Sequence, residues 1–167
     1  EFAQGWPAMM ILFQIHDAFS GGGTPHLPPI ELGVNESWFR VVVHSSAMAD
    51  PQVASDVDAF VAVQHVPMVW DRWARIVIRS VYKLDGTGEL DVWYDGKRAC
   101  ALRNIYNAYP TNPLFVQTGA YSGLDQLRAP VSSKVVYSTG VRIFDDATTH
   151  AEMGVSSDIP LVSSGSF

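Results

Sequence analysis

The stretch "WARIVIRSVYKLDGTGELDVWYDGKRACAL", residues 73 to 102, carries the clearest structural signal in the sequence. It contains three runs rich in β-branched, aromatic and other apolar residues, which favour strands, and turn-forming residues separate the runs. Asp95-Gly96 suits a two-residue turn, because such a turn needs positive φ at both central positions. "LDGTGE", residues 84 to 89, is a second turn of the same kind. The stretch therefore predicts a three-stranded antiparallel meander.

Most of the remaining sequence has the same character. Four further segments are predicted to be strands: residues 11 to 17, 38 to 45, 114 to 122 and 134 to 144. Residues 50 to 66 alone could be helical, and they fit a loop followed by a strand equally well. Short strands joined by tight turns predict an all-β protein built as an antiparallel sandwich or barrel. We expect one domain over residues 1–153 and a tail or linker over residues 154–167.

The composition restricts the classes of function. The chain has 167 residues, of which 47% are hydrophobic and 17% charged, enough for a sizeable core. Cys100 is the only cysteine, so no intrachain disulfide can form, and we expect it to be a small core residue. The formal charge of −6 argues against a nucleic-acid partner. No apolar run reaches the roughly 18 residues of a membrane span, and the histidines lack metal-ligand spacing. We therefore expect no membrane association, metal or cofactor.

The strand "ILFQIHD", residues 11 to 17, has an unusual polar face. Side chains alternate along a strand, so Ile11, Phe13 and Ile15 are expected on one face. Leu12, Gln14 and His16 are then expected on the other face. The prediction is one apolar face and one face that carries an amide and an imidazole.

The strand "LFVQTGAYSG", residues 114 to 123, has a similar polar face. Phe115, Gln117, Gly119 and Tyr121 share one side of an extended strand, and the glycine leaves room above the backbone. If this strand and residues 11 to 17 lie in the same sheet, their amides, imidazole and phenol form the floor of a groove. Such a groove suits a polymeric ligand.

The order of these motifs resembles that of the polysaccharide lyases of the heparin lyase I and glucuronan lyase type. The motifs are "ILFQIHD", "PPIELGV", "WARIVIRSVYKLDGTGELDVWYDGKRA", "FVQTGAYSG" and "VVYSTGVRIFDD", and they span roughly residues 8 to 153. The sequence is similar, more distantly, to alginate lyases. The resemblance implies a concanavalin A-like jelly roll of two antiparallel sheets, the concave one forming a glycan cleft.

The resemblance also implies roles for individual residues. It assigns Gln14 and His16 to neutralising a uronate carboxylate and handling a proton, and it assigns Tyr121 to the catalytic phenol. β-Elimination at a uronic acid removes the weakly acidic C5 proton, so the carboxylate charge must be stabilised while a base and an acid move protons. Either Tyr121 or His16 can be the base, depending on the C5 stereochemistry of the substrate.

Binding residues and partners follow from the same expectation. Substrate-binding candidates are Gln117, Arg75, Arg79 and Lys97, the last three as local cations for an anionic polysaccharide. Cleavage of such a glycan implies an extracellular or secreted protein. Family members usually begin with further strands that supply an arginine to the cleft. We therefore expect an exposed sheet edge that a partner chain or another segment of a longer protein completes.

A second hypothesis is a non-catalytic carbohydrate-binding or structural sandwich, for example of a virion or cell-surface protein. Family members commonly carry lysine where this chain has Gln117, and a lysine there would lower the pKa of the tyrosine. Fold alone does not decide between the two hypotheses.

Overall fold

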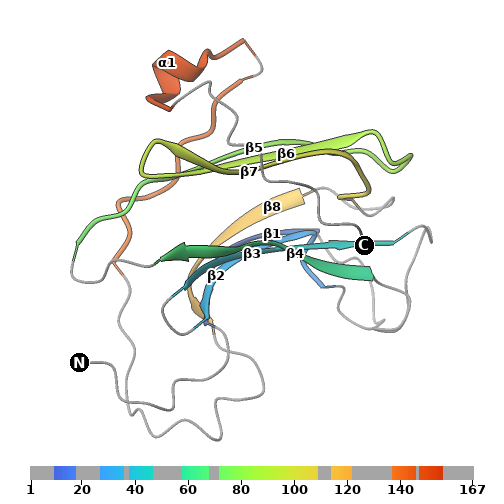
Figure 1. The fold of residues 1–167 in the computed structure, drawn as a ribbon, viewed down its shortest axis with the longest axis horizontal. Coiled ribbons are helices and arrows are strands. Elements are labelled where there is room, and N and C mark those ends of the chain that lie inside the picture. The colour runs from blue at the N-terminus through green and yellow to red at the C-terminus, as the bar shows by residue number, and fades with distance from the viewer. Residues whose placement is uncertain are drawn as a thin grey trace, which may run out of the picture.

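Two antiparallel β-sheets stacked face to face make up this protein (Figure 1). The structure is a computed structural model that describes residues 10–17, 27–35, 38–46, 58–67, 72–108, 114–121, 137–145 and 147–155. Strands dominate these residues, and the helix among them, α1 (His150–Met153), is one turn long. The predicted all-β sandwich is confirmed.

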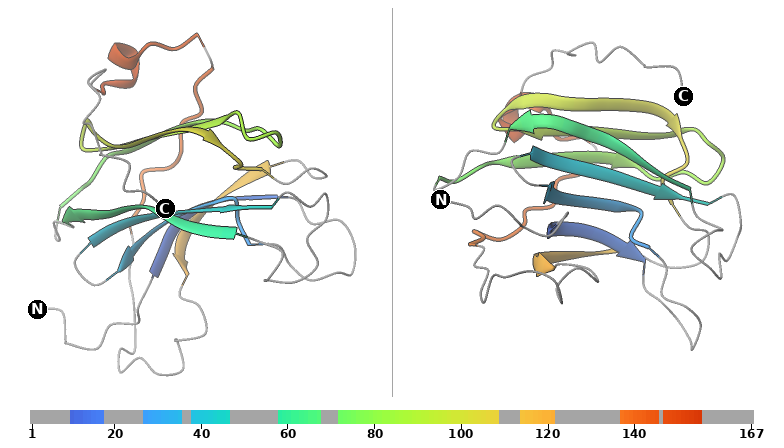
Figure 2. Two further views of the ribbon diagram at one scale, coloured as in Figure 1. Left: turned by 45° about the vertical axis from the view of Figure 1, so that its right-hand side comes forward. Right: turned by 60° about the horizontal axis from the view of Figure 1, so that its bottom comes forward.

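The larger sheet has five strands in the order β4-β3-β2-β1-β8. Their bounds are β1 (Met10–Asp17), β2 (Ile30–Asn35), β3 (Trp38–Ser45), β4 (Asp58–Pro67) and β8 (Leu114–Tyr121). The first four follow one another along the chain, and β8 joins from far away in the sequence. It pairs antiparallel with β1 at one edge of the sheet, as the right-hand view of Figure 2 shows. This pairing places the two strands with polar motifs side by side.

The smaller sheet is the predicted meander of β5 (Ile76–Val81), β6 (Gly88–Tyr94) and β7 (Lys97–Ile105). The turn between β6 and β7 has φ of 51° at Asp95 and 79° at Gly96, as a two-residue hairpin of this kind requires. Asn107 is fully buried at the end of the meander opposite the Asp95-Gly96 turn. Its amide donates to Ser80 Oγ and to the carbonyl oxygens of Val81 and Glu89, and so links the residue after β7 to β5 and β6.

The core lies between the two sheets. Its buried side chains come from both layers: Ile30, Leu32, Phe39, Val41, Val43 and Val63 from the larger sheet, and Leu90, Val92, Tyr94, Ala99 and Cys100 from the smaller. Phe13 and Ile15 of β1 pack against this cluster. Cys100 is 2% exposed, as expected for a core residue, and burial raises the pKa of its thiol to about 12.

The outer face of the smaller sheet carries a charged network and the short helix. Asp91, buried on this face, contacts Arg79 and Arg103, and Trp93 packs against Val77 and against Met153 of α1. These contacts stabilise the outer face of the meander.

One sequence prediction needs revision, and a second left two alternatives open. Residues 134 to 144 were expected to form a strand, but the described part, 137–144, is exposed and has no strand partner among the residues that the structure describes. Gly140 has a φ of 97°, and its N–H donates to Ser138 Oγ, so a local turn interrupts the extended pattern. Of residues 50 to 66, the described part belongs to strand β4, which agrees with the alternative of a strand and not with a helix; the remainder lies outside the described residues.

Candidate functional site

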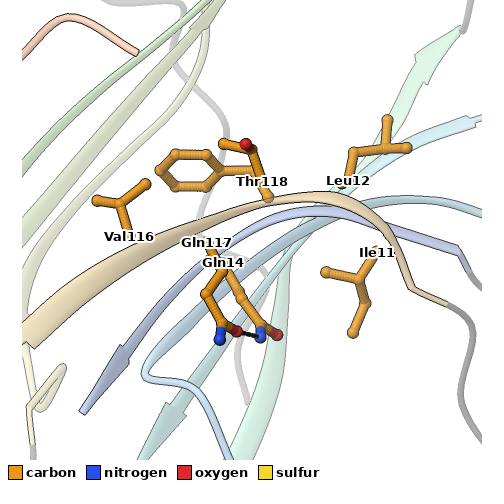
Figure 3. Close-up of a pocket in the computed structure, with 8 residues that line it drawn as sticks. Ile11, Leu12, Gln14, Val116, Gln117 and Thr118 are labelled. Atoms are coloured by element: carbon orange, nitrogen blue, oxygen red, sulfur yellow. Dashed lines mark hydrogen bonds between the residues drawn. The ribbon is translucent and has the colours of Figure 1, made fainter. Parts of the chain in front are cut away.

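The candidate site begins with two glutamines on neighbouring strands. Gln14 of β1 and Gln117 of β8 are partners in the antiparallel register, so their side chains project to the same side of the sheet. The Gln14 Nε2 group donates a hydrogen bond to Gln117 Oε1 (Figure 3). The predicted meeting of these two amides is therefore present in the structure.

The two amides lie on the face of the larger sheet that points away from the core. Val116 and Thr118 project from the opposite side of β8 (Figure 3), the side on which the smaller sheet lies. In the same view, β1 and β8 arch over the amides, so Gln14 and Gln117 occupy the concave side. An open hollow of about 470 Å³ adjoins the two strands, and its lining residues come from both faces: Ile11, Gln14 and Gln117 from the amide side, and Leu12, Val116 and Thr118 from the opposite side.

His16 lies one step further along this face. It pairs with Phe115 across β1 and β8, and the two rings stack with centroids 5.6 Å apart and planes inclined by 21°. Since His16 and Gln14 are two residues apart on a regular part of β1, the imidazole and the amide share the concave face. The structure thus combines Gln14, His16 and Gln117 on one surface.

A bulge near the start of β1 changes the predicted faces of two residues. The register shifts between Ile11 and Phe13, so that Leu12 is an extra residue relative to β2. Consequently Ile11 lies on the side of Gln14 and Leu12 on the opposite side, as Figure 3 shows. The prediction that placed Ile11 with Phe13, and Leu12 with Gln14, was wrong at this position.

Tyr121 ends strand β8, and its backbone pairs with Ile11. Ile11 lies on the Gln14 side of the sheet, so the register position of Tyr121 is compatible with the expected groove. The side chain of Tyr121 lies outside the described part of the structure. Its catalytic role stays a prediction from the resemblance.

Glu31, which the sequence analysis did not select, lies beside Gln14. The two are register partners across β1 and β2, and Glu31 is 6% exposed. Burial raises the pKa of its carboxyl group to about 7, although the positive charge of Arg40 acts in the opposite direction. An acidic residue at an alternating position of the apolar strand "IELGV" was the available signal, but its partner could be known only from the strand pairing.

His44 and Arg40 of β3 accompany Glu31. The His44 Nδ1 group donates to the Pro28 carbonyl oxygen at 2.7 Å and lies 3.8 Å from Glu31 Oε1. Burial is the main cause that lowers the pKa of His44; the hydrogen bond to Pro28 opposes the shift, and the charge of Arg40 adds to it. Arg40 pairs with Gly33, two residues beyond Glu31 on β2. This face of the sheet therefore has a cation, although the sequence analysis did not identify it.

The three predicted substrate-binding cations lie elsewhere. Arg75 precedes β5 and donates to the Met153 carbonyl oxygen, Arg79 of β5 contacts Glu89 and Asp91, and Lys97 begins β7. All three belong to the smaller sheet or its approach, whereas Gln14 and His16 belong to the larger one. The structure therefore does not bring these cations together with the two amides. Alternation along a strand predicts which face a side chain occupies, but it does not predict which sheet the strand joins.

The described residues contain no group of three or more His, Cys, Asp or Glu side chains arranged to hold a metal ion. No helix within the described ranges is long and apolar enough to cross a membrane.

One comparison with known proteins identifies a family, and another identifies a similar fold. The sequence profile of a family described as "Polysaccharide lyase" matches residues 2–150. A structure search matches the crystal structure of endo-β-1,4-glucuronan lyase from the fungus Trichoderma reesei, with a TM-score of 0.61 and 15% sequence identity. The match covers 75% of this chain and 53% of the fungal enzyme, so the chain spans about half of that enzyme's length. A search of curated proteins found no match. At this identity the structural likeness concerns the fold.

Proposed function

The chain belongs to the polysaccharide lyase family, and on that premise we propose that it cleaves a uronate-containing glycan by β-elimination. The observation that carries the proposal is the meeting of Gln14, Gln117 and His16 on the concave face. Strands far apart in the sequence supply these groups, and none of the three belongs to the apolar core. They are the residue types that the reaction needs.

The amides would bind the uronate carboxylate. Removal of the C5 proton places negative charge on that carboxylate, and hydrogen bonds to its oxygens stabilise the charge more in the transition state than in the ground state. Gln14 and Gln117 each carry an amide N–H₂ donor group within reach of a ligand on this face. Substrate binding would require the Gln14–Gln117 hydrogen bond to open or to rearrange.

His16 and Tyr121 would move the protons. One group takes the C5 proton and the other protonates the departing glycosidic oxygen, as general base and general acid. Stacking on Phe115 holds the His16 ring in one orientation, which favours transfer along a fixed direction. Tyr121 is proposed for the second role on the strength of its strand position and the family resemblance.

The fungal protein with the matching fold is a glucuronan lyase, so a β-1,4-linked glucuronan is the first substrate to test. The neutral β-1,4-glucan provides a matched control, because it has the same linkage without the carboxylate. A lyase forms a new reducing end together with a C4–C5 double bond, whereas a hydrolase forms the reducing end alone. Double-bond formation from glucuronan and not from the glucan is the expected result.

The non-catalytic alternative has one specific observation in its favour. The Gln14 amide already donates to Gln117, and a lysine at position 117 would instead have left that amide available. If glucuronan binds without forming any unsaturated product, the chain is a glycan-binding module. If glucuronan neither binds nor reacts, the proposed uronate substrate is wrong.

A further inference from the structure

A buried acid lies directly beside the proposed carboxylate-binding amides. In the strand register, Gln14 has Gln117 on one side and Glu31 on the other, so the three form a row across β8, β1 and β2. Neighbouring strands are about 5 Å apart, so the Glu31 carboxyl group is close to the amide of Gln14. Glu31 is 6% exposed, in contrast to Gln117 at the edge of the sheet.

Among the residues with described side chains, the ionisable groups around Glu31 come from two strands. On β3, His44 Nδ1 lies 3.8 Å from Glu31 Oε1, and Arg40 is close enough for its charge to act on both Glu31 and His44. On β1, His16 follows Gln14 on the same face. Leu114, Phe115, Val116, Gln117, Thr118 and Gly119, the described side chains of β8, carry no charge. None of the other described groups in this neighbourhood is an acid, so Glu31 is the described group whose ionisation adds a negative charge here.

We propose that Glu31 is a specificity-determining residue of the glycan site, and that it must carry its proton for a uronate carboxylate to bind beside Gln14. The inference rests on the proposed function, since it takes the concave face as the place where the glycan binds. Glu31 acts through its charge and does not need to touch the substrate.

The physical reason is repulsion across a short distance with little screening. An ionised Glu31 places a buried negative charge about one strand spacing from the amide that holds the substrate carboxylate, and buried charges are screened weakly by salt. Burial raises the pKa of Glu31 to about 7, so its charge changes near neutral pH. His44 does not compensate, because burial lowers its pKa and its Nδ1–H is directed at Pro28.

The positive charge of Arg40 also belongs to the electrostatics of this site. Whatever the charge state of Glu31, Arg40 contributes a positive charge that acts on Glu31 and His44. When Glu31 ionises, it offsets that charge. The same titration leaves a neutral glycan unaffected, so Glu31 sets a preference for anionic substrate on the acidic side of neutral pH.

The test compares wild-type protein with Glu31→Gln and Glu31→Asp on glucuronan at about pH 6 and about pH 8.5. The wild-type KM should rise about tenfold between these pH values, because a nearby charge of this kind changes affinity by roughly that factor. The KM of Glu31→Gln should stay at the low-pH value throughout, and Glu31→Asp should keep the rise. The kcat values of Glu31→Gln and Glu31→Asp should follow that of the wild type at both pH values, because Glu31 acts on substrate binding.

Two results would overturn the inference: an unchanged wild-type KM at the two pH values, or a rise in Glu31→Gln equal to that of the wild type. The first needs no variant and is independent of whether Glu31→Gln folds. If the wild type forms no unsaturated product, the proposed β-elimination fails, and the same comparison is made with the dissociation constant of the intact polymer by calorimetry. A dissociation constant that is independent of pH would then overturn the role of Glu31, and one that rises with pH in the wild type alone would support it.

Discussion

Gln14 and Gln117 are 103 positions apart in the sequence, yet their side chains are joined by a hydrogen bond across β1 and β8. This contact defines the concave site, because it fixes which faces of the two strands point the same way. His16 and Phe115, the next register partners on the same face, extend that surface by a ring stack. The proposed function depends on these two residue pairs between β1 and β8.

Replacing Gln117 by lysine tests whether the site lacks a cation. A charge four residues from Tyr121 on the same strand should favour the phenolate and raise kcat on glucuronan by about tenfold, equivalent to one pKa unit. Gln117→Met, of similar size and uncharged, is the matched control. An equal gain in Gln117→Met would attribute the effect to loss of the Gln14–Gln117 hydrogen bond, and not to charge.

Tyr121→Phe removes the proposed proton-carrying hydroxyl and keeps the ring. Loss of a general acid or base typically lowers turnover by about 10²- to 10⁴-fold, so kcat should fall by at least the lower figure while glycan affinity stays within a few-fold. Steady-state kinetics and calorimetry measure the two quantities. A variant with wild-type turnover would remove Tyr121 from the mechanism.

Phe115→Ala tests whether the ring stack orients His16. The loss of an aromatic contact is worth about 0.5–1.5 kcal/mol, so kcat on glucuronan should fall by roughly two- to tenfold. Val116→Ala on the opposite face of β8 is the matched control, because Phe115 and Val116 are both 39% exposed. Equal effects of the two substitutions would show that they act through strand stability alone.

The sequence predicted the meander well because its turn chemistry is local. Asp95 and Gly96 adopt positive φ as expected, and the three strands pair accordingly. The prediction that "LDGTGE" forms a two-residue turn of the same kind was wrong, because Gly86 has positive φ but Asp85 does not, and residues 82–87 form a longer loop between β5 and β6. Alternation also placed Gln14 with His16 correctly. The bulge at Leu12 escaped prediction because Ile11, Leu12 and Phe13 are all apolar, so no change of polarity marks the extra residue.

Other features of the site depend on contacts that a linear sequence does not contain. Glu31 becomes a candidate only when β2 is known to lie beside β1. Arg79 is on a strand face as expected, but that face belongs to the smaller sheet, where Glu89 and Asp91 bind its guanidinium group. Residues 137–144 have the composition of a strand and lack a partner strand among the described residues.

The stability of the folded protein should report the charge state of Glu31 without any substrate. Its folded pKa is raised from 4.5 to about 7, so its contribution is fully present below the unfolded value and is lost as the pH rises through about 7. Between about pH 5 and pH 8, wild type should therefore lose about 1 to 3 kcal/mol of unfolding free energy relative to Glu31→Gln. His44, whose lowered pKa acts below about pH 6.5, contributes to both proteins and cancels in the difference. Urea unfolding of both proteins at the two pH values measures this difference in unfolding free energy. The same pH dependence in wild type and Glu31→Gln would contradict the burial of an acid at this position.

The most direct test of the central claim is the ultraviolet absorbance of the unsaturated uronate formed when wild-type protein is incubated with β-1,4-glucuronan. β-Elimination predicts that the absorbance rises in step with new reducing ends, that β-1,4-glucan gives neither signal, and that His16→Ala abolishes both signals on glucuronan. New reducing ends without the absorbance would show hydrolysis, and glycan binding with neither signal would show a binding module, so either result would contradict the proposed lyase activity.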